Sequence, residues 1–345
     1  MNKVKMAIVG AGIWGENHAR IYNAHPFAEV VALCDMNLEK AREVAARVNI
    51  PQVYSDYNEM FEKSGCDAVA VVTPDFLHAD VAVAAAEHKK HILIEKPLAT
   101  TAEDVHRMVK AIRENGVRAM VDLHNRWSPP FNAAYEAVQR GDLGEVYSAY
   151  IRLNDIKWVA TDMLRWASKS SILWFLGSHS LDTLRWMFHD EVKRVYSVSR
   201  SGVLKDLGVD TVDEYLTTIE FRNGGIAQME NGWITPNANP CVNDIKFNVL
   251  GTKGMIALDV SNHNLIQMYT DEKVTVPDVL VQNHIFGNPK GFAFESIRSF
   301  VDCLLTGEEF HVSLEDAANT SLAILAIMES AEKRMPVDVE FRKER

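Results

Sequence analysis

Lys5-Met-Ala-Ile-Val-Gly10-Ala-Gly12-Ile-Trp-Gly15 is the stretch that decides the fold of this chain. An apolar run leads into three glycines with the spacing G-x-G-x-x-G, and Asp35 follows the last glycine by 20 residues, after a second apolar run. In this fingerprint the first glycine permits a tight turn, the second lets backbone amides approach a pyrophosphate, and the third lets the next helix pack closely. The sequence therefore predicts a strand, a helix from about Ile13 to His25, and a dinucleotide site.

Asp35 predicts which dinucleotide binds. A carboxylate at the end of the second strand accepts hydrogen bonds from the adenosine ribose hydroxyls and repels a 2′-phosphate, so NAD is favoured over NADP. Ile13 and Trp14 lie between the last two glycines and are assigned to the same cofactor loop. The helix that follows presents its N-terminal amides and the positive end of its dipole to the phosphates.

Composition limits the class of protein and its partners. The 345 residues are 47% hydrophobic and 24% charged, which is typical of a soluble globular protein with two domains. The net charge of -11 argues against nucleic acid or an anionic membrane as a partner and favours a small molecule. Neither an apolar signal segment nor a run of membrane-spanning length is visible, which predicts a cytoplasmic protein.

The cysteines give no sign of a disulfide framework or of a metal. Cys34, Cys66, Cys241 and Cys303 are far apart and form no C-x-x-C motif. No spacing of histidine, cysteine and carboxylate residues is typical of a metal site, so the sequence predicts none. We expect reduced and mostly buried thiols.

Alternating strand and helix patterns fill the first 120 residues or so. The predicted strands include 30–34, 67–72, 91–94 and 117–123, with helices over 38–47 and 77–89. Thr100-Thr-Ala-Glu103 is a possible capping box for a further helix, which Gly116 closes. This α/β alternation predicts a doubly wound parallel sheet, the Rossmann fold. Ser128-Pro129-Pro130 interrupts the pattern, and the NAD-binding domain is assigned to residues 1–124.

The remaining residues, 125–345, show a different pattern and are assigned to substrate binding and oligomerisation. Hairpin signatures join 214–221 to 226–233 and 245–250 to 255–260, and helical patterns cover 131–140, 292–305 and 314–333. The second domain is therefore predicted to be α+β, built on a mainly antiparallel sheet. Its helices are expected to leave one sheet face uncovered, which favours a homodimer or homotetramer.

Two more motifs follow predicted parallel strands. Thr73-Pro74, with His78, comes after one strand, and Glu95-Lys96-Pro97 comes after the next. Ligands of open α/β sheets bind outside the carboxyl ends of the strands, so both loops are predicted to face the cofactor. His78 either lines the nicotinamide side or caps the helix that begins near it.

With these motifs the chain resembles the Gfo/Idh/MocA oxidoreductases, the family of glucose-fructose oxidoreductase and inositol dehydrogenase. The resemblance extends over nearly the whole chain and includes the segments Arg126-Trp127, Gly141-Asp-Leu-Gly144 and Gly177-Ser-His179-x-x-Asp182. It implies hydride transfer between nicotinamide and a carbinol carbon of a sugar, sugar acid or cyclitol. It also implies that Lys96 touches the reacting oxygen, that His179 exchanges its proton, and that the protein is a homo-oligomer.

Elementary chemistry supports those two roles. Oxidising an alcohol requires removal of a proton as the hydride leaves, and imidazole has a pKa near working pH. A nearby ammonium group stabilises developing alkoxide charge. The alternatives without a catalytic role are that Lys96 is a surface lysine beside a proline turn and that His179 is a structural histidine of a helix.

Phe175 departs from the family pattern, which commonly has Asp four residues before the histidine. A phenyl ring neither accepts a proton nor orients a hydroxyl, so the relay is simpler, substrate binding differs, or ordinary dehydrogenation has been lost. Ser170 and Ser171 replace the glycines that usually open this segment and are candidates to cap the helix. Asp182 either orients His179 or is a solvated carboxylate or a partner of Arg185.

The substrate pocket is predicted from a segment without clear periodicity. Indole faces suit the apolar faces of sugars, and a cation there would hold a carboxylate. The residues assigned to substrate binding, besides Lys96, Phe175 and His179, are Arg126, Lys157, Trp158, Arg165 and Trp166. The alternatives are that Arg126 positions a loop, and that Trp158, Trp166 and Trp174 are core or interface aromatics.

The leading hypothesis is an NAD-dependent oxidoreductase acting on a hydroxyl of a monosaccharide, sugar acid or cyclitol. A related alternative uses tightly held NAD for transient oxidation, with net epimerisation, elimination or glycoside cleavage. A noncatalytic, NAD-responsive regulatory protein is the alternative from another class, and Phe175 is its best support.

Overall fold

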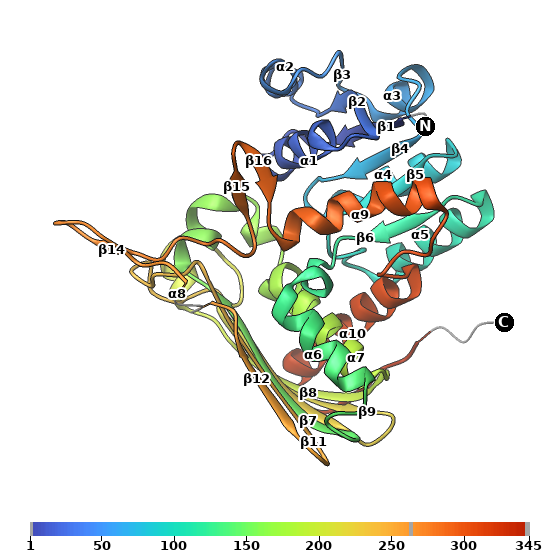
Figure 1. The fold of residues 1–345 in the computed structure, drawn as a ribbon. Coiled ribbons are helices and arrows are strands. Elements are labelled where there is room, and N and C mark those ends of the chain that lie inside the picture. Colours follow the sequence, from blue (N-terminus) through green and yellow to red (C-terminus); the bar gives the residue numbers. More distant parts are fainter. Residues whose placement is uncertain (1–2, 262–264, 342–345) are drawn as a thin grey trace. The chain divides into compact units, whose positions relative to one another are not determined.

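Six parallel strands form the first sheet, in the order β3-β2-β1-β4-β5-β6 (Figure 1). The computed structural model describes residues 3–261 and 265–341. The strands are β1 (Val4–Val9), β2 (Ala28–Cys34), β3 (Gln52–Tyr54), β4 (Ala68–Val71), β5 (His91–Ile94) and β6 (Ala119–Val121). The chain reverses its progress across the sheet between β1 and β4, which is the switch point where such sheets bind ligands.

Four helices of this part lie close to their predicted ranges, and the sequence patterns did not predict two others, α3 (Tyr57–Lys63) and the one-turn η1 (Asp75–Leu77). The four are α1 (Ile13–Ala24), α2 (Leu38–Val48), α4 (His78–Glu87) and α5 (Ala102–Asn115). The capping prediction for α5 was wrong by one residue. Thr101, not Thr100, accepts the backbone N–H of Asp104 with its hydroxyl, because two adjacent threonines offered two registers. Gly116 closes the helix in the left-handed conformation, as predicted.

Residues 1–124 and 280–318 make up one compact unit, and residues 125–279 and 319–345 make up another. The cut after His124 falls where the sequence placed the domain boundary. The sequence pattern assigns all residues after 124 to the second domain, but residues 280–318 belong to the first unit. Their helix α9 (Phe292–Thr306) packs against α1 and β1, and the apolar periodicity of α9 shows that it has a buried side without showing what covers it.

The second unit is built on a seven-stranded sheet with the order β12-β11-β7-β10-β9-β8-β17. β7 and β10 pair in parallel and every other described neighbour pair is antiparallel, so the sheet is mixed but mainly antiparallel, as predicted. Both hairpins form where the sequence placed them. The strands are β7 (Val146–Asp155), β8 (Val192–Arg200), β9 (Glu214–Phe221), β10 (Ile226–Gly232), β11 (Asn243–Gly251), β12 (Met255–Asp259) and β17 (Val337–Asp338).

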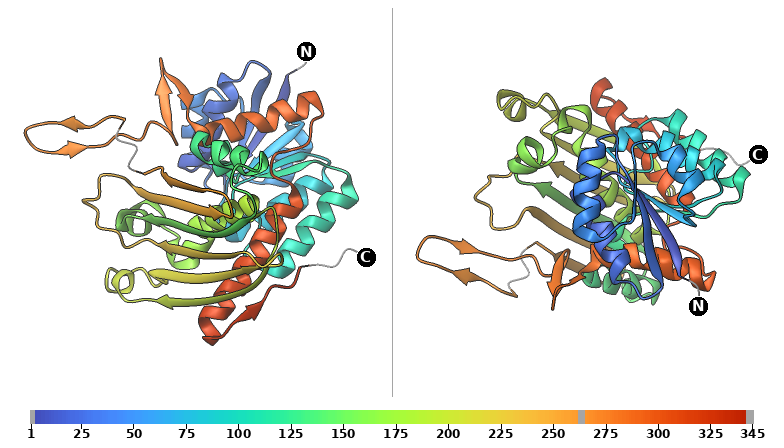
Figure 2. Two further views of the ribbon diagram at one scale, coloured as in Figure 1. Left: turned by 60° about the horizontal axis from the view of Figure 1, so that its bottom comes forward. Right: turned by 90° about the horizontal axis from the view of Figure 1, so that it is seen from above.

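Helices cover one face of this sheet (Figures 1 and 2). Inward-pointing residues such as Ile151, Ile219 and Phe247 are fully buried, and Ser197 of β8 is bonded to Ser330 of the last helix. The outward face carries exposed apolar side chains and a shallow groove of about 370 Å³. The helices concerned are α6 (Pro129–Gln139), α7 (Ser178–Phe188) and α10 (Leu314–Lys333), whose first residues belong to the other unit.

Short elements complete the description. Two small hairpins, which the sequence patterns did not predict, are β13 (Met268–Tyr269) with β14 (Val274–Thr275) and β15 (Asn283–Ile285) with β16 (Asn288–Lys290). The others are η2 (His124–Trp127), η4 (Ala167–Lys169), α8 (Val203–Asp206) and two π-helical turns, η3 (Val159–Met163) and η5 (Leu173–Gly177). Among the helices that the structure describes, none is long and apolar enough to cross a membrane.

Candidate active site

The glycine loop joins β1 to α1 at the carboxyl edge of the parallel sheet. Gly10 has φ +113° and lies so close to β4 that a Cβ would overlap the carbonyl of Val72. At Gly15 a Cβ would overlap the carbonyl oxygen of Gly10, so any side chain would push the helix off the loop. Gly12 caps α1, and open space surrounds the position that its Cβ would occupy. These positions fit a pyrophosphate held by backbone amides at the helix N-terminus.

Asp35 lies beside this loop, at the end of β2. One carboxylate oxygen accepts the backbone N–H of Ala11 at 2.8 Å and the other accepts that of Asn37 at 2.9 Å. The two bonds fix the carboxylate at the mouth of the glycine loop while each oxygen keeps a further lone pair. The geometry suits an acceptor for ribose hydroxyls.

Ile13 and Trp14 differ in what surrounds them. The Ile13 side chain is 68% exposed in the first turn of α1. The Trp14 ring stacks on His124 and meets the edge of Phe294, with 6.4 Å between ring centroids in both cases. Trp14 therefore anchors the loop through its side chain.

The two predicted strand-end loops lie on the same edge and are tied together by His78. Its Nδ1 lies 2.8 Å from the carbonyl oxygen of Pro97, and its Nε2 lies 3.0 Å from that of Thr73. The imidazole is 1% exposed. Both earlier alternatives for His78 were therefore incomplete, because the ring neither caps α4 nor lies open toward a ligand. It joins the loop after β4 to the loop after β5.

Glu95, Lys96 and Pro97 follow β5 directly. The backbone N–H of Glu95 extends the sheet by donating to Val71, and the Lys96–Pro97 peptide is cis. Burial raises the pKa of the Glu95 carboxyl, but a hydrogen bond with His18 and attraction to His18 and Lys96 outweigh it, so the pKa lies below its usual value. Glu95 is therefore an anion beside a half-buried lysine, and Lys96 is positioned at the ligand-binding edge of the sheet.

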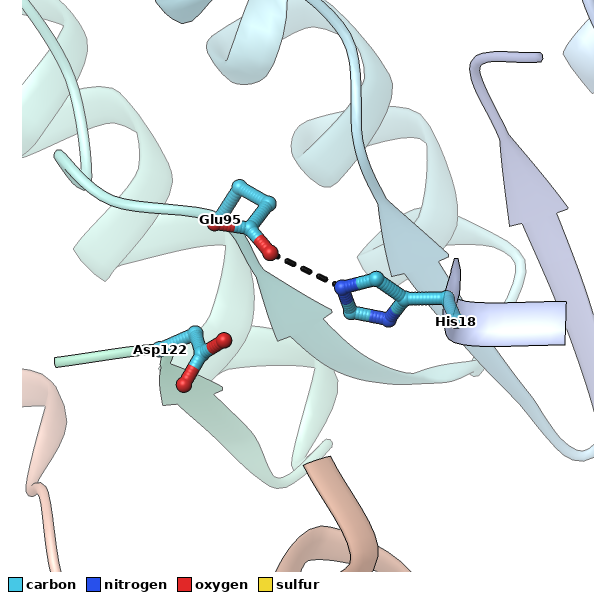
Figure 3. Close-up of side chains that lie close together, drawn as sticks. All are labelled: His18, Glu95 and Asp122. Atoms are coloured by element: carbon cyan, nitrogen blue, oxygen red, sulfur yellow. Dashed lines mark hydrogen bonds and ion pairs between the residues drawn. The ribbon is translucent and has the colours of Figure 1, made fainter. Parts of the chain in front are cut away.

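Sequence reasoning missed His18. Its Nε2 lies 2.8 Å from Glu95 Oε1 and its Nδ1 lies 3.3 Å from the hydroxyl of Tyr22 (Figure 3). The imidazole is buried in α1, three residues after Gly15. A polar residue on the otherwise apolar side of that helix was the available signal.

His179 belongs to the second unit, in the first turn of α7. The side chain is 4% exposed, and its carbonyl accepts the hydroxyl of Thr183 at 2.7 Å. The π-helical turn that contains Phe175 runs directly into this helix, and such turns are frequent at functional sites. The Ser171 hydroxyl accepts the N–H of Leu173, but the residue at the N-cap of this turn is Ile172 and that of α7 is Gly177, so neither serine takes the predicted capping position.

Arg126 and Asp182 form a buried ion pair within the second unit. The contacts are 2.6 Å from Nη2 to Oδ1 and 3.0 Å from Nε to Oδ2. This supports the positioning role for Arg126 over substrate contact. Asp182 is neither a solvated carboxylate nor the partner of Arg185, because Arg185 pairs with Glu191.

The predicted substrate loop lies between β7 and α7. Lys157 and Trp166 are half-buried, Arg165 is exposed, and Trp158 is 43% exposed with its backbone N–H bonded to Asn237. The structure thus leaves Trp158 accessible. Trp174, by contrast, is buried and serves the core.

Comparison with known proteins identifies the scaffold. Residues 4–123 match the model of the GFO/IDH/MocA oxidoreductase family with its NAD-binding Rossmann fold, and residues 131–257 match the GFO/IDH/MocA C-terminal domain. The chain belongs to the GFO/IDH/MocA oxidoreductase family. Like other members of that family it is an oxidoreductase whose cofactor is NAD, which fits the glycine loop and Asp35 described above.

Three known proteins illustrate the similarity. Scyllo-inositol 2-dehydrogenase (NAD⁺) of Bacillus subtilis is 26% identical over 99% of this chain and 98% of its own length. Levoglucosan dehydrogenase of Pseudarthrobacter phenanthrenivorans is 29% identical over 78% of this chain and 76% of its own. The scyllo-inositol dehydrogenase of Lactobacillus casei, solved with NAD(H) and scyllo-inositol, has a TM-score of 0.82 with 19% identity, covering 98% of this chain and 99% of its own.

Proposed function

We propose that this protein is an NAD-dependent dehydrogenase that oxidises a hydroxyl-bearing carbon of a cyclitol, sugar or sugar acid. The observation that carries the proposal is the Glu95-Lys96-Pro97 turn, which follows β5 on the same sheet edge as the glycine loop. Relatives named for inositol and levoglucosan support the substrate class. When bound, NAD supplies the carbon that accepts the hydride.

Lys96 and His179 are proposed to handle the proton. A lysine ammonium lowers the pKa of the substrate hydroxyl and stabilises negative charge on its oxygen. An imidazole removes the proton, and its ordinary pKa suits neutral pH. The pKa of the Glu95 carboxyl lies below its usual value, so Glu95 keeps an anionic charge beside Lys96.

Substrate recognition is proposed to involve the segment between β7 and α7. The accessible face of Trp158 offers a platform for the apolar face of a sugar ring. Lys157 and Arg165 supply positive charge for an acidic substrate, with Trp166 beside them in sequence. Phe175 removes one polar contact from this set, so we expect a narrower range of polyols than an aspartate at that position would allow.

The experiment is NADH formation by the purified protein with a panel of inositols, neutral sugars, and uronic and aldonic acids. We expect a substrate-dependent rise with at least one member. Lys96→Ala and His179→Ala should each lower kcat by about 10²-fold or more. Lys90→Ala, on the same unit but bonded to the Cys66 carbonyl at the opposite side of the strands, is the matched control. Full activity of His179→Ala across the pH range would disprove its role. NAD binding without NADH formation would favour transient oxidation or a sensing role.

We further propose that two copies pair through the outward face of the seven-stranded sheet. Its exposed residues include Leu216, Ile226, Leu250 and Met255, the last three of which line the groove. Contiguous apolar surface of this kind is typical of an interface. Ile226→Asp with Met255→Asp should yield monomers in light scattering, whereas Leu207→Asp, at an exposed position directly after α8, should not. An unchanged mass for the double variant would overturn the proposal.

A further inference from the structure

Two buried side chains and one half-buried side chain, from three different parts of the chain, converge at the cofactor edge of the parallel sheet (Figure 3). His18 comes from α1, Glu95 follows β5, and Asp122 follows β6. One ligand atom of each lies within 4.8 Å of the other two. They are distant in sequence, so no spacing motif revealed them, and the sequence prediction of no metal did not consider this combination.

Asp122 is the residue that needs an explanation. Its side chain is 0% exposed, and neither carboxylate oxygen makes a hydrogen bond within the described part of the chain. Nδ1 of His124 lies 3.8 Å from Oδ2 of Asp122, beyond hydrogen-bonding distance. A buried carboxylate without a donor is costly. A cation beside the Asp122 carboxylate would offset this cost.

A second carboxylate, that of Glu95, adds to the negative charge beside Asp122. Glu95 lies in the same cluster, and its bond with His18 satisfies Oε1. Two carboxylates this close in a buried site repel each other unless a positive charge lies between them. A divalent ion neutralises both at once, whereas a single proton neutralises one.

The donor set also suits a particular class of ion. One imidazole nitrogen with two carboxylates is a ligand set for divalent transition ions such as Mn²⁺ or Zn²⁺. With bonds of about 2.1 Å, neighbouring ligand atoms around a tetrahedral ion are about 3.4 Å apart, so the cluster needs only small movements. Tyr22 is placed to accept the other N–H of His18, which is the usual support of a ligating histidine.

We propose that His18, Glu95 and Asp122 form a binding site for one divalent transition ion. Binding takes Nε2 of His18 away from its hydrogen bond and leaves the ring proton on Nδ1, directed at Tyr22. The Glu95 side chain is 13% exposed, which gives the ion its access from solvent. The ion joins α1 to the ends of β5 and β6, next to Lys96. This site is independent of the proposed substrate and does not depend on activity.

The test is metal binding by the full-length protein after removal of metals with a chelator. Mn²⁺ is the main probe because it avoids the thiols, which prefer Zn²⁺. Equilibrium dialysis with elemental analysis should show one Mn²⁺ per chain. Asp122→Asn and His18→Gln should each weaken binding by about 100-fold or more, since losing only a supporting residue already costs about 10–100-fold.

Asp302→Asn is the matched control, because Asp302 also faces a histidine, His25, at 3.1 Å in the same unit. It should bind Mn²⁺ like the parent protein. Circular dichroism of the metal-free variants confirms that they are folded, and His18→Gln provides a second variant if Asp122→Asn is not. Absence of stoichiometric Mn²⁺ from the parent protein would overturn the site in favour of a shared proton. Binding that Asp122→Asn and His18→Gln leave unchanged would overturn it equally.

Discussion

Arg126 holds both carboxylate oxygens of Asp182, at 2.6 Å and 3.0 Å, in a pair that is almost fully buried. Removing one partner of a buried ion pair leaves an uncompensated charge and typically costs about 3–5 kcal/mol. We therefore expect Asp182→Asn to lower the free energy of unfolding by about that amount in urea denaturation. Asp142→Asn, from an exposed pair with Arg140, should change it little. A stable Asp182→Asn protein with a shifted pH–rate profile would instead indicate a role in the proton relay.

His78 offers a test of how the cofactor edge is held. His78→Phe keeps a ring of similar size but removes both contacts to the carbonyls of Thr73 and Pro97. Loosening these two loops should weaken NAD binding by about 10-fold, because the loss of one hydrogen bond typically costs about 1 kcal/mol. Calorimetric titration with NAD measures it. His88→Phe at the end of α4 is the control, and equal NAD affinities in the two variants would contradict the structural role.

Asp35→Asn tests the cofactor preference without removing side-chain volume. The amide can still accept the N–H of Ala11 or Asn37, but it lacks the charge that repels a 2′-phosphate. We expect the ratio of the NADP Kd to the NAD Kd to fall by about 10-fold or more, since hydrogen bonds to charged groups contribute about 1.5–3 kcal/mol. An unchanged ratio, measured by fluorescence titration, would remove the ribose assignment.

Glu16 makes stability depend on pH. The hydrogen bond from Arg47 lowers the pKa of the Glu16 carboxyl below its usual value near 4.5, and Arg20 adds to the effect. A carboxyl whose pKa is lower in the folded state contributes stability above its unfolded pKa and loses it as pH falls through the folded pKa. The Tm difference between the parent protein and Glu16→Gln should therefore shrink from pH 7 to below pH 4. A constant difference would mean that the ion pair contributes nothing.

Phe175→Asp restores the residue type common in the family. Phe175 is half-buried in the π-helical turn before His179, so the new carboxylate has partial access to solvent. We expect a broader range of oxidised polyols in the NADH assay. Phe175→Leu, which keeps the side chain apolar, should retain the parent range. Loss of folding in both variants would show instead that the ring packs an essential surface.

Most of the fold was predictable because local rules decide it. The spacing of Gly10, Gly12 and Gly15 specifies a strand, a turn and a helix, and the Asn223-Gly-Gly225 turn specifies a hairpin in register. The helix over residues 314–333 has the bounds that its periodicity predicted. The mixed pairing of β7 with β10 joins residues about 80 positions apart, so no local pattern reveals it.

Site residues were predictable only where the residues next to them in the sequence form a recognisable motif. Lys96 lies in a motif directly after a strand, so its place on the sheet edge followed from topology. The partners of Asp182 and His78 could not be predicted in this way. Several groups could bond to each side chain, and only the packing of distant segments decides which of them lies within reach. Asp122 shows this limit most clearly, because no motif near it in the sequence indicates that it lies close to His18 and Glu95.

The return of residues 280–318 to the first unit has a practical consequence for dissecting the protein. The chain passes between the units three times, after residues 124, 279 and 318. A fragment ending at His124 would lack α9, and the apolar surfaces of α1 and β1 that this helix contacts would be bared to water. An isolated nucleotide-binding unit would therefore have to combine residues 1–124 with residues 280–318. We expect a fragment made by a single truncation to aggregate.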